Sequence, residues 1–195
     1  MIAHTLAALT TYSGQDSLVN LAILVHDIGK AATLGVRNGY PTYHGHERAG
    51  VPLIQGIADR LKLPGITRQA LVFTLEHHMQ VMRLADMRPA KVKTLVADRN
   101  WPLLKEVARA DCAAKGDVLA VQDLERMIVE AEKRSAPFLA RPVVTGARII
   151  KLTGLDPGPE VGQVIREVIE WAIDTGIFDP TAIDTRILKI TRKMV

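Results

Sequence analysis

The chain has 195 residues, enough for one good-sized domain or for one domain with a small appendage. Hydrophobic residues make up 48% of the sequence and aromatic residues only 4%, which favours packed aliphatic helices over an aromatic-rich β-sandwich. The net charge of +4 is too mild to indicate nucleic-acid binding by itself, although it suits ligands that carry phosphate.

Three sequence features bear on the cellular compartment. The longest apolar stretch, residues 18–25, is far too short to span a bilayer, so no membrane partner is expected. Cys112 is the one cysteine, which excludes an internal disulfide and is typical of a reducing compartment. The first residues lack the basic stretch and long apolar core of a signal peptide. These features together predict a cytoplasmic protein.

Apolar residues recur at helical spacing along most of the chain, and proline, glycine and capping residues divide it into segments. The predicted helices cover residues 3–12, 16–29, 46–61, 67–78, 89–98, 102–115, 117–134, 147–152, 160–175 and a last segment that opens at Pro180. Residues 31–45, with three glycines and a proline, are expected to form a loop. No alternating pattern predicts a strand, so the predicted fold class is all-α.

Residues 136–144 contain two prolines and no clear period, which is typical of a connection between two parts of a chain. We therefore expect residues 1–135 to form the main domain and residues 136–195 to form a small C-terminal helical extension. The sequence contains neither an internal repeat nor a low-complexity tract, so nothing divides the main domain further.

The six histidines are the most informative residues of the chain. His4 lies near the start, and the other five fall in three short motifs: Val-His-Asp-Ile-Gly-Lys over 25–30, Tyr-His-Gly-His-Glu over 43–47 and Glu-His-His-Met over 76–79. Histidine is the commonest protein ligand of transition metals. Because no histidine lies outside His4 and these three motifs, a single metal site is the simplest explanation of the pattern.

Several of these residues interrupt the apolar stripe of a predicted helix. Ala22 and Ile23 share the side of His26, and Leu53 continues the side that begins at His46. Four helices carry a polar residue on their core-facing side in this way: His26, His46, His77 or His78, and Asp111. His77 and His78 differ by about 100° around their helix, so both could bind one metal only at its edge.

Burying Asp27 and Asp111 without partners would be unfavourable by several kcal/mol. Too few basic residues share these stripes to neutralise the two carboxylates, whereas a metal ion would satisfy them and the imidazoles together. The alternative is a set of separately hydrogen-bonded core histidines, with the two aspartates in helix caps or ion pairs. For the set as a whole, the metal is the interpretation that we adopt.

The order His4, then His26-Asp27, then Asp111 resembles the signature of HD-domain phosphohydrolases. That family is all-helical, and its four signature residues bind a metal. The resemblance implies an HD-domain helical bundle in which these four residues form the first metal site.

His46 and the His77-His78 pair resemble the additional ligands of HD proteins that have room for two metals. By this resemblance Asp27 would bridge the two ions. His46, with His77 or His78, would hold the second.

Longer segments resemble the HD region of bacterial CCA-adding tRNA nucleotidyltransferases. The similarity covers nearly the whole chain: residues 4–6, 24–30, 43–50, 60–64 and 78–79 resemble the HD region, and 142–146 and 154–162 resemble the tail that follows it. The Gly-Gly-x-Val-Arg-Asp signature of the catalytic head is missing. The resemblance therefore implies phosphomonoesterase, 2'-nucleotidase or 2',3'-cyclic phosphodiesterase chemistry rather than nucleotide addition.

The expected cofactor is one or two divalent transition-metal ions. Mixed His and Asp ligands favour Mn, Fe, Co, Ni or Zn, and Mg is less favoured because it prefers oxygen ligands. Asp27 would hold the metal during catalysis, and Lys30 would reach a phosphate of the substrate, as in related HD proteins. The alternative for Lys30 is a cation that stabilises a helix C-terminus.

The expected function is hydrolysis of a nucleotide or another small phosphoester. The alternative function is a non-catalytic module that binds RNA or another partner and is related to the body of the tRNA nucleotidyltransferases. The two hypotheses differ in the ligand set, because a binding module could lose metal ligands freely. This chain keeps all of them, which favours the enzyme.

Overall fold

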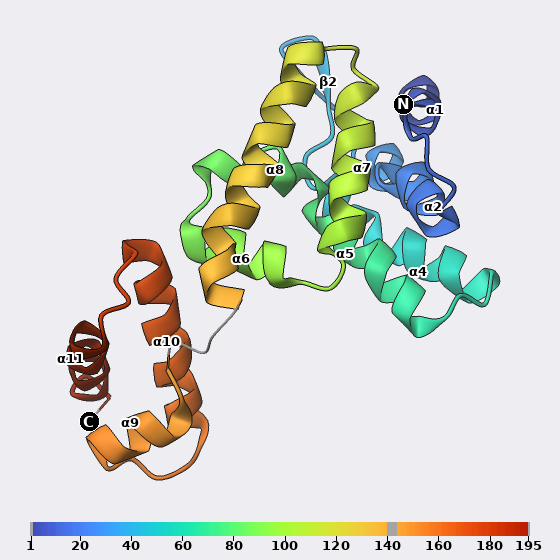
Figure 1. Ribbon diagram of the computed structural model, residues 1–195. Helices are drawn as coiled ribbons and strands as arrows, with labels where there is room; N and C mark the ends of the chain where they lie inside the picture. The colour runs from blue at the N-terminus through green and yellow to red at the C-terminus, as the bar shows by residue number, and fades with distance from the viewer. Residues whose placement is uncertain (1, 140–143, 195) are drawn as a thin grey trace. The chain divides into compact units, whose positions relative to one another are not determined.

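The computed structural model describes residues 2–139 and 144–194. Helices dominate these residues, and their only strands form one two-stranded hairpin, so the predicted all-α class is confirmed (Figure 1). Within the same residues, no helix combines the length and the apolar character that a membrane span requires.

The elements and their bounds, in chain order, are α1 (Ile2–Thr11), α2 (Ser17–Val25), the 3₁₀ helix η1 (Ile28–Ala32), β1 (Gly35–Arg37), β2 (Tyr40–Thr42), α3 (His46–Ala49), α4 (Val51–Arg60), α5 (Gly65–Val81), the 3₁₀ helix η2 (Leu84–Asp86), α6 (Pro89–Ala97), α7 (Trp101–Ala113), α8 (Val118–Leu139), α9 (Gly146–Thr153), α10 (Pro159–Thr175) and α11 (Pro180–Thr191). The helix starts follow local chemistry. Asp16, Thr145 and Asp179 accept backbone N–H groups at the starts of α2, α9 and α11.

The described residues divide into two compact units. Among the described residues, unit 1 comprises 2–85 and 98–130, and unit 2 comprises 86–97, 131–139 and 144–194. The predicted division after residue 135, into a metal-binding domain and a C-terminal extension, stays a prediction.

In unit 1, α5 packs against α7, α1 and α2 pack on α7, and α4 packs on α5 (Figure 1). Their shared core is aliphatic, as the composition predicts, and includes Ile23, Ile54, Leu71, Leu75 and Val107. Because α2, α5 and α7 share this core, any polar residue on their inner faces must lie close to the others.

Unit 2 is organised around α10, which packs with α6, α9 and α11. Its core includes Ile149, Val164, Val168, Ile183 and Ile187. The backbone N–H of Ala90 in α6 donates to Asp174 Oδ1 of α10 at 3.0 Å, and Arg88 forms an ion pair with Glu170. Helix α6 (Pro89–Ala97) therefore packs with α10 (Pro159–Thr175), which lies far along the sequence.

Residues 31–45 contain more structure than the predicted loop. Helix α2 ends at Val25 instead of near residue 29, and the chain continues as η1 and then as a β-hairpin in which Val36 pairs with Pro41. Asn38 and Gly39 have φ values of 51° and 80°, the positive angles that a type I′ turn requires at both central positions. The expectation of no strand was wrong here, since strands of three residues are too short for alternation to reveal.

The predicted helix over 46–61 divides at Gly50, which keeps right-handed helical angles (φ −76°, ψ −20°). Its buried side consists of His46, Gly50, Ile54 and Ala58, which are spaced four residues apart. Leu53 lies off this line and is 40% exposed, so the prediction that it shares the side of His46 was wrong. The spacing still carries His46 into the core of unit 1.

Candidate metal centre

Six of the predicted metal-site residues converge in unit 1 from five segments of the chain. They are His4 of α1, His26 at the C-terminal cap of α2, Asp27 before η1, His46 at the start of α3, His78 of α5 and Asp111 of α7. Five of them are at most 5% exposed, and the His4 side chain is 24% exposed. This set of buried polar side chains interrupts an otherwise aliphatic core.

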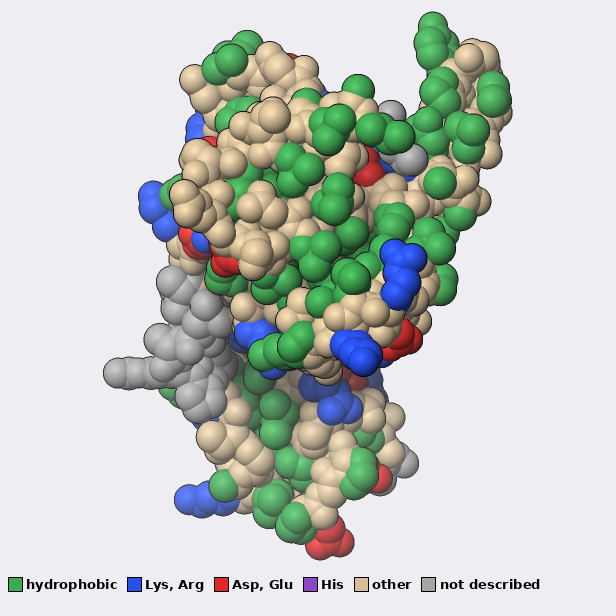
Figure 2. Space-filling model, turned by 90° about the vertical axis from the view of Figure 1, so that its right-hand side faces the viewer, with side chains coloured by type: hydrophobic (Ala, Val, Ile, Leu, Met, Phe, Trp, Pro, Cys, Tyr) green, Lys and Arg blue, Asp and Glu red, His purple; other side chains and the backbone are tan. Residues whose placement is uncertain are grey.

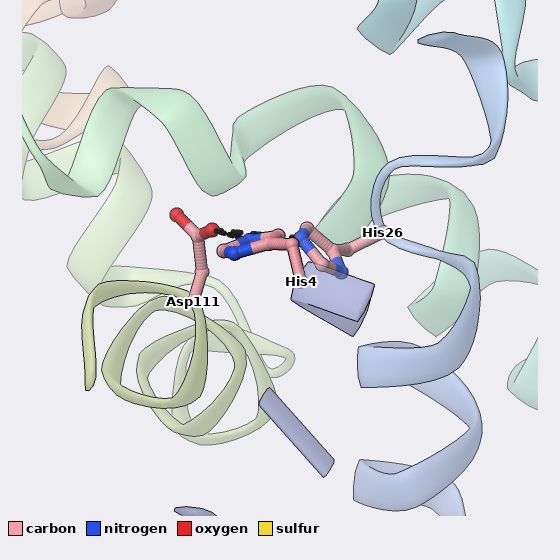
Figure 3. Close-up of side chains that lie close together, drawn as sticks. All are labelled: His4, His26 and Asp111. Atoms are coloured by element: carbon pink, nitrogen blue, oxygen red, sulfur yellow. Dashed lines mark hydrogen bonds and ion pairs between the residues drawn. The ribbon is translucent and has the colours of Figure 1, made fainter. Parts of the chain in front are cut away.

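The first group consists of His4, His26 and Asp111, whose potential ligand atoms all lie within 4.8 Å of one another. His4 Nε2 is 2.7 Å from Asp111 Oδ1, and His26 Nε2 is 3.6 Å from the same oxygen. Figure 3 shows His4 and Asp111 pointing toward each other with the His26 ring beside them. The contact between His4 and Asp111 joins residues 107 positions apart in the sequence.

The second group consists of Asp27, His46 and His78, which also offer ligand atoms within 4.8 Å of one another. His46 Nε2 is 3.4 Å and His78 Nε2 is 3.7 Å from Asp27 Oδ1, and the two imidazole nitrogens are 3.2 Å apart. All three residues are buried. The group has the composition of a two-histidine, one-carboxylate metal site.

Asp27 lies between the two groups. Its Oδ1 faces His46 and His78, while its Oδ2 is 3.3 Å from His26 Nε2 of the first group. Each carboxylate oxygen therefore points to a different set of imidazoles. This is the arrangement that a bridging carboxylate needs.

Three of the histidines share one hydrogen-bonding pattern. The Nδ1 atoms of His26, His46 and His78 each lie 2.7–2.9 Å from the backbone carbonyl oxygen three residues earlier. A carbonyl oxygen only accepts, so each Nδ1 carries the proton and donates it, which leaves a lone pair on Nε2. The same second-sphere hydrogen bond orients histidine ligands in known metal sites.

In this tautomer each Nε2 atom is an acceptor that a cation or a hydrogen-bond donor would satisfy. His26 Nε2 is buried and has no hydrogen-bond partner, and the lone pairs of His46 and His78 would face each other at 3.2 Å. Buried acceptors without a donor are costly, and adjacent lone pairs repel. Imidazole nitrogens and carboxylate oxygens that face one centre are the donor set of a transition metal, so the residues present fit such an ion.

The carboxyl groups and the imidazoles of the centre shift one another's pKa values. Burial opposes ionisation of Asp27, yet the imidazoles of His26, His46 and His78 outweigh it and hold the pKa of the carboxyl well below its usual range. Burial likewise lowers the pKa of His26, but Asp111 and Asp27 outweigh this and raise it to about 9. A proton thus takes the position that a metal would take, and ligation requires its release.

Both aspartates also have lysine partners, which corrects the expectation that basic residues would be too few. Lys30 Nζ donates to Asp27 Oδ2 at 2.5 Å, and Lys115 Nζ donates to Asp111 Oδ2 at 3.0 Å. The lysine side chains are 23% and 50% exposed, whereas the carboxylates are buried. The ammonium groups therefore approach from the solvent side, while the imidazoles enclose the inner side.

The remaining predicted ligand, His77, does not join either group. Its ring packs against Phe73 with ring centroids 4.5 Å apart, on the side of α5 away from His78. The 100° between neighbouring helix positions separates the two side chains. The structure thus brings His78 to the centre and leaves His77 outside it, and His44 is exposed in the loop before α3.

The sequence is similar to parts of tRNA nucleotidyltransferases. The A-adding tRNA nucleotidyltransferase of Deinococcus radiodurans is 31% identical over 177 residues, which cover 83% of this chain and 39% of that protein. The multifunctional CCA protein of Halorhodospira halophila is 36% identical over 178 residues, 84% of this chain and 40% of that protein. The chain is related to these tRNA nucleotidyltransferases.

The chain spans about two fifths of the length of these two relatives. A further relative, the multifunctional CCA protein of Legionella pneumophila strain Paris, is 36% identical over 95 residues, 48% of this chain and 23% of that protein. No family model and no solved structure matches the chain. The relationship therefore concerns a part of each relative, and the activity of the whole relatives does not pass directly to this chain.

Two features of the centre escaped the sequence analysis. Lys115 follows Asp111 by four residues, and this helical spacing is the signal that could have revealed the ion pair. Gly29 lies where a Cβ atom would come within 1.9 Å of the His46 carbonyl oxygen, so η1 and α3 approach closely only at a glycine. The sequence shows that Gly29 lies between Asp27 and Lys30, but it does not show that Gly29 contacts the His46 backbone in the folded chain.

Proposed function

We propose that this chain is a phosphohydrolase of the HD type that depends on one or two divalent transition-metal ions, with Mn, Fe, Co, Ni or Zn favoured over Mg. The observation that carries the proposal is the position of Asp27 between two groups of histidines, next to a buried His26 Nε2 that has no hydrogen-bond partner. A purely structural core would be more stable with apolar residues at these positions, since buried charge is costly. The substrate class is a nucleotide or another small phosphoester.

The geometry suggests which residues would hold each ion. His4, His26 and Asp111 would hold one ion and His46 with His78 a second, with Asp27 shared between them. A bound divalent metal lowers the pKa of a coordinated water and polarises a phosphoryl oxygen. The backbone carbonyls behind His26, His46 and His78 fix the imidazole rings, so that little reorganisation is needed when a substrate arrives.

Lys30 is the proposed phosphate-binding residue. Its ammonium group lies 2.5 Å from Asp27 Oδ2 on the solvent side of the centre, and the Tyr43 ring lies 5.7 Å from it. A cation held there would attract a phosphate that approaches the same carboxylate-bound ion. Because Lys30 is not a metal ligand in this proposal, its loss should affect substrate binding more than metal content.

We expect Lys30→Ala to raise KM for a phosphoester by about tenfold, the value of one charge-assisted hydrogen bond, while metal content stays unchanged. Steady-state kinetics and elemental analysis of the same preparation measure both. Arg48→Ala is the matched control, because Arg48 is an exposed cation in the same region and its loss should leave KM as it is. Loss of metal from the Lys30 variant would show that Lys30 supports the site instead of binding substrate.

The proposal itself is tested by metal analysis of the purified protein, together with assays on p-nitrophenyl phosphate, its bis ester, 2'-AMP and 2',3'-cyclic AMP. We expect bound transition metal, hydrolysis of at least one substrate, and loss of hydrolysis after chelation with recovery on adding metal. Metal-loaded protein that hydrolyses none of the four would contradict the proposal.

The adjacent histidines supply a matched pair of variants for this test. His78→Gln should lower metal content and turnover together, because it removes a nitrogen that faces Asp27. His77→Gln should change neither, because His77 packs on Phe73. An equal effect of the two substitutions would mean that the centre is not where the proposal puts it.

A second candidate function is RNA binding without turnover. It is favoured by the name of the Deinococcus radiodurans relative, an A-adding tRNA nucleotidyltransferase. A gel-shift titration with tRNA separates the two candidates: tight tRNA binding by protein that hydrolyses no phosphoester would favour the module. Turnover that His78→Gln abolishes would favour the enzyme whether or not RNA binds.

A further inference from the structure

An apolar pocket of about 240 Å³ lies beside the proposed metal centre in unit 1. Helix α1 and the end of α2 supply part of its wall, and the residues that follow Asp27 supply the rest. Besides Asp27 itself, it is lined by Ile2, Thr5, Leu6, Leu24, Ile28 and Ala31. The pocket belongs to no part of the function proposed so far.

The wall of this pocket is aliphatic although it faces solvent. Ile2, Leu6 and Leu24 are 73%, 55% and 53% exposed, values unusual for large hydrophobic side chains that lie together. The face of unit 1 that carries α1 and α2 is turned toward the viewer in the upper part of Figure 2, where hydrophobic side chains gather. Such a surface gains free energy when an apolar group covers it.

The pocket and the metal centre share their framework. Asp27 lines the pocket and also faces both histidine groups, and α1 carries both His4 of the centre and Leu6 of the wall. Leu24 precedes His26 by two residues at the end of α2. A substrate whose phosphoryl group reached the centre would therefore have its next group beside this wall.

We propose that the pocket binds a flat, uncharged aromatic ring esterified to the phosphoryl group of the substrate. This inference rests on the proposed function for the phosphoryl group and adds the chemistry of the group next to it. Asp27 is the one charged side chain that lines the pocket among the described residues, so the pocket offers no cation to a second anionic group. A cavity of about 150 Å³ already holds benzene, so this pocket has room for one ring system of that kind.

Binding of two non-hydrolysable probes, phenylphosphonate and methylphosphonate, tests the inference without requiring turnover. Titration calorimetry on the Mn²⁺-loaded protein should give a Kd at least about tenfold lower for phenylphosphonate, since burial of one ring contributes this much. Leu24→Ser and Leu6→Ser should each reduce that ratio at least about threefold. Both residues are more than half exposed, so the variants should fold.

Leu61→Ser is the matched control, because Leu61 is 54% exposed and does not line the pocket. The ratio should stay unchanged in this variant. Equal affinity for the two probes, no binding of either, or a ratio that Leu24→Ser and Leu6→Ser leave intact would overturn the inference. Parallel assays with phenyl phosphate and methyl phosphate test the proposed function separately: aromatic preference without turnover would retain the pocket and reject the hydrolase.

Discussion

An Asp27→Asn protein should retain less than about one tenth of the metal of the unmodified protein, because the substitution removes the charge that both histidine groups face. Phosphohydrolase turnover should fall by about 10³-fold or more, since the loss of metal-derived stabilisation amounts to several kcal/mol. Asparagine keeps the volume of the side chain, so packing is preserved while the anion is lost. Elemental analysis and assays under substrate saturation measure the two effects.

Asp59→Asn is the control for this experiment, because Asp59 is an exposed carboxylate of unit 1 that pairs with Arg68. Metal content and turnover should stay at the level of the unmodified protein. Circular dichroism of both variants verifies that the helices are retained. Full turnover by the Asp27 variant would reject the proposed centre, whatever its metal content.

Gly29→Ala should destabilise unit 1 by about 3 kcal/mol, at the upper end of the range for overpacking a buried site. The added Cβ would lie 1.9 Å from the His46 carbonyl oxygen and 2.6 Å from the Gly50 nitrogen. Both contacts are with backbone, so no side-chain rotation relieves them. Urea unfolding, analysed by linear extrapolation, measures the loss of free energy.

The same substitution should also lower metal content, since separating η1 from α3 moves Asp27 away from His46. Gly56→Ala provides the comparison: Gly56 lies inside α4 with nothing within 4 Å of its Cβ position, so alanine there should be neutral or stabilise by about 0.5–1 kcal/mol. If the two glycine variants were equally stable, the close approach of η1 and α3 would not be important for the fold.

Much of the helical framework could be predicted from the sequence, because its helices are amphipathic or are bounded by caps and prolines. The burial of His26, His46, His78 and Asp111 followed from their positions relative to apolar neighbours. Periodicity acts within one helix, however, and does not say which helix faces which. That six side chains from five segments meet was expected only from their chemistry and from the resemblance to HD proteins.

The parts that escaped prediction depend on contacts between segments. The hairpin over 35–42 is held by pairing of two three-residue strands, which leave no readable alternation. Lys30 and Lys115 follow their aspartates at helical spacing. Whether such a lysine contacts its aspartate or extends into solvent depends on the packing of neighbouring segments. The choice between His77 and His78 depends on where α5 meets its neighbours, which the sequence of α5 alone does not contain.

The contact between His4 and Asp111 closes a loop of more than a hundred residues between the first helix and α7. An ion held there would act as a reversible cross-link, and the thermal midpoint of the protein would rise with the free metal concentration. Amide hydrogens of α1 should then exchange faster in chelator than in metal-containing buffer. Since α1 also forms one wall of the apolar pocket, scarcity of metal would loosen the proposed ring-binding pocket as well as the proposed metal centre.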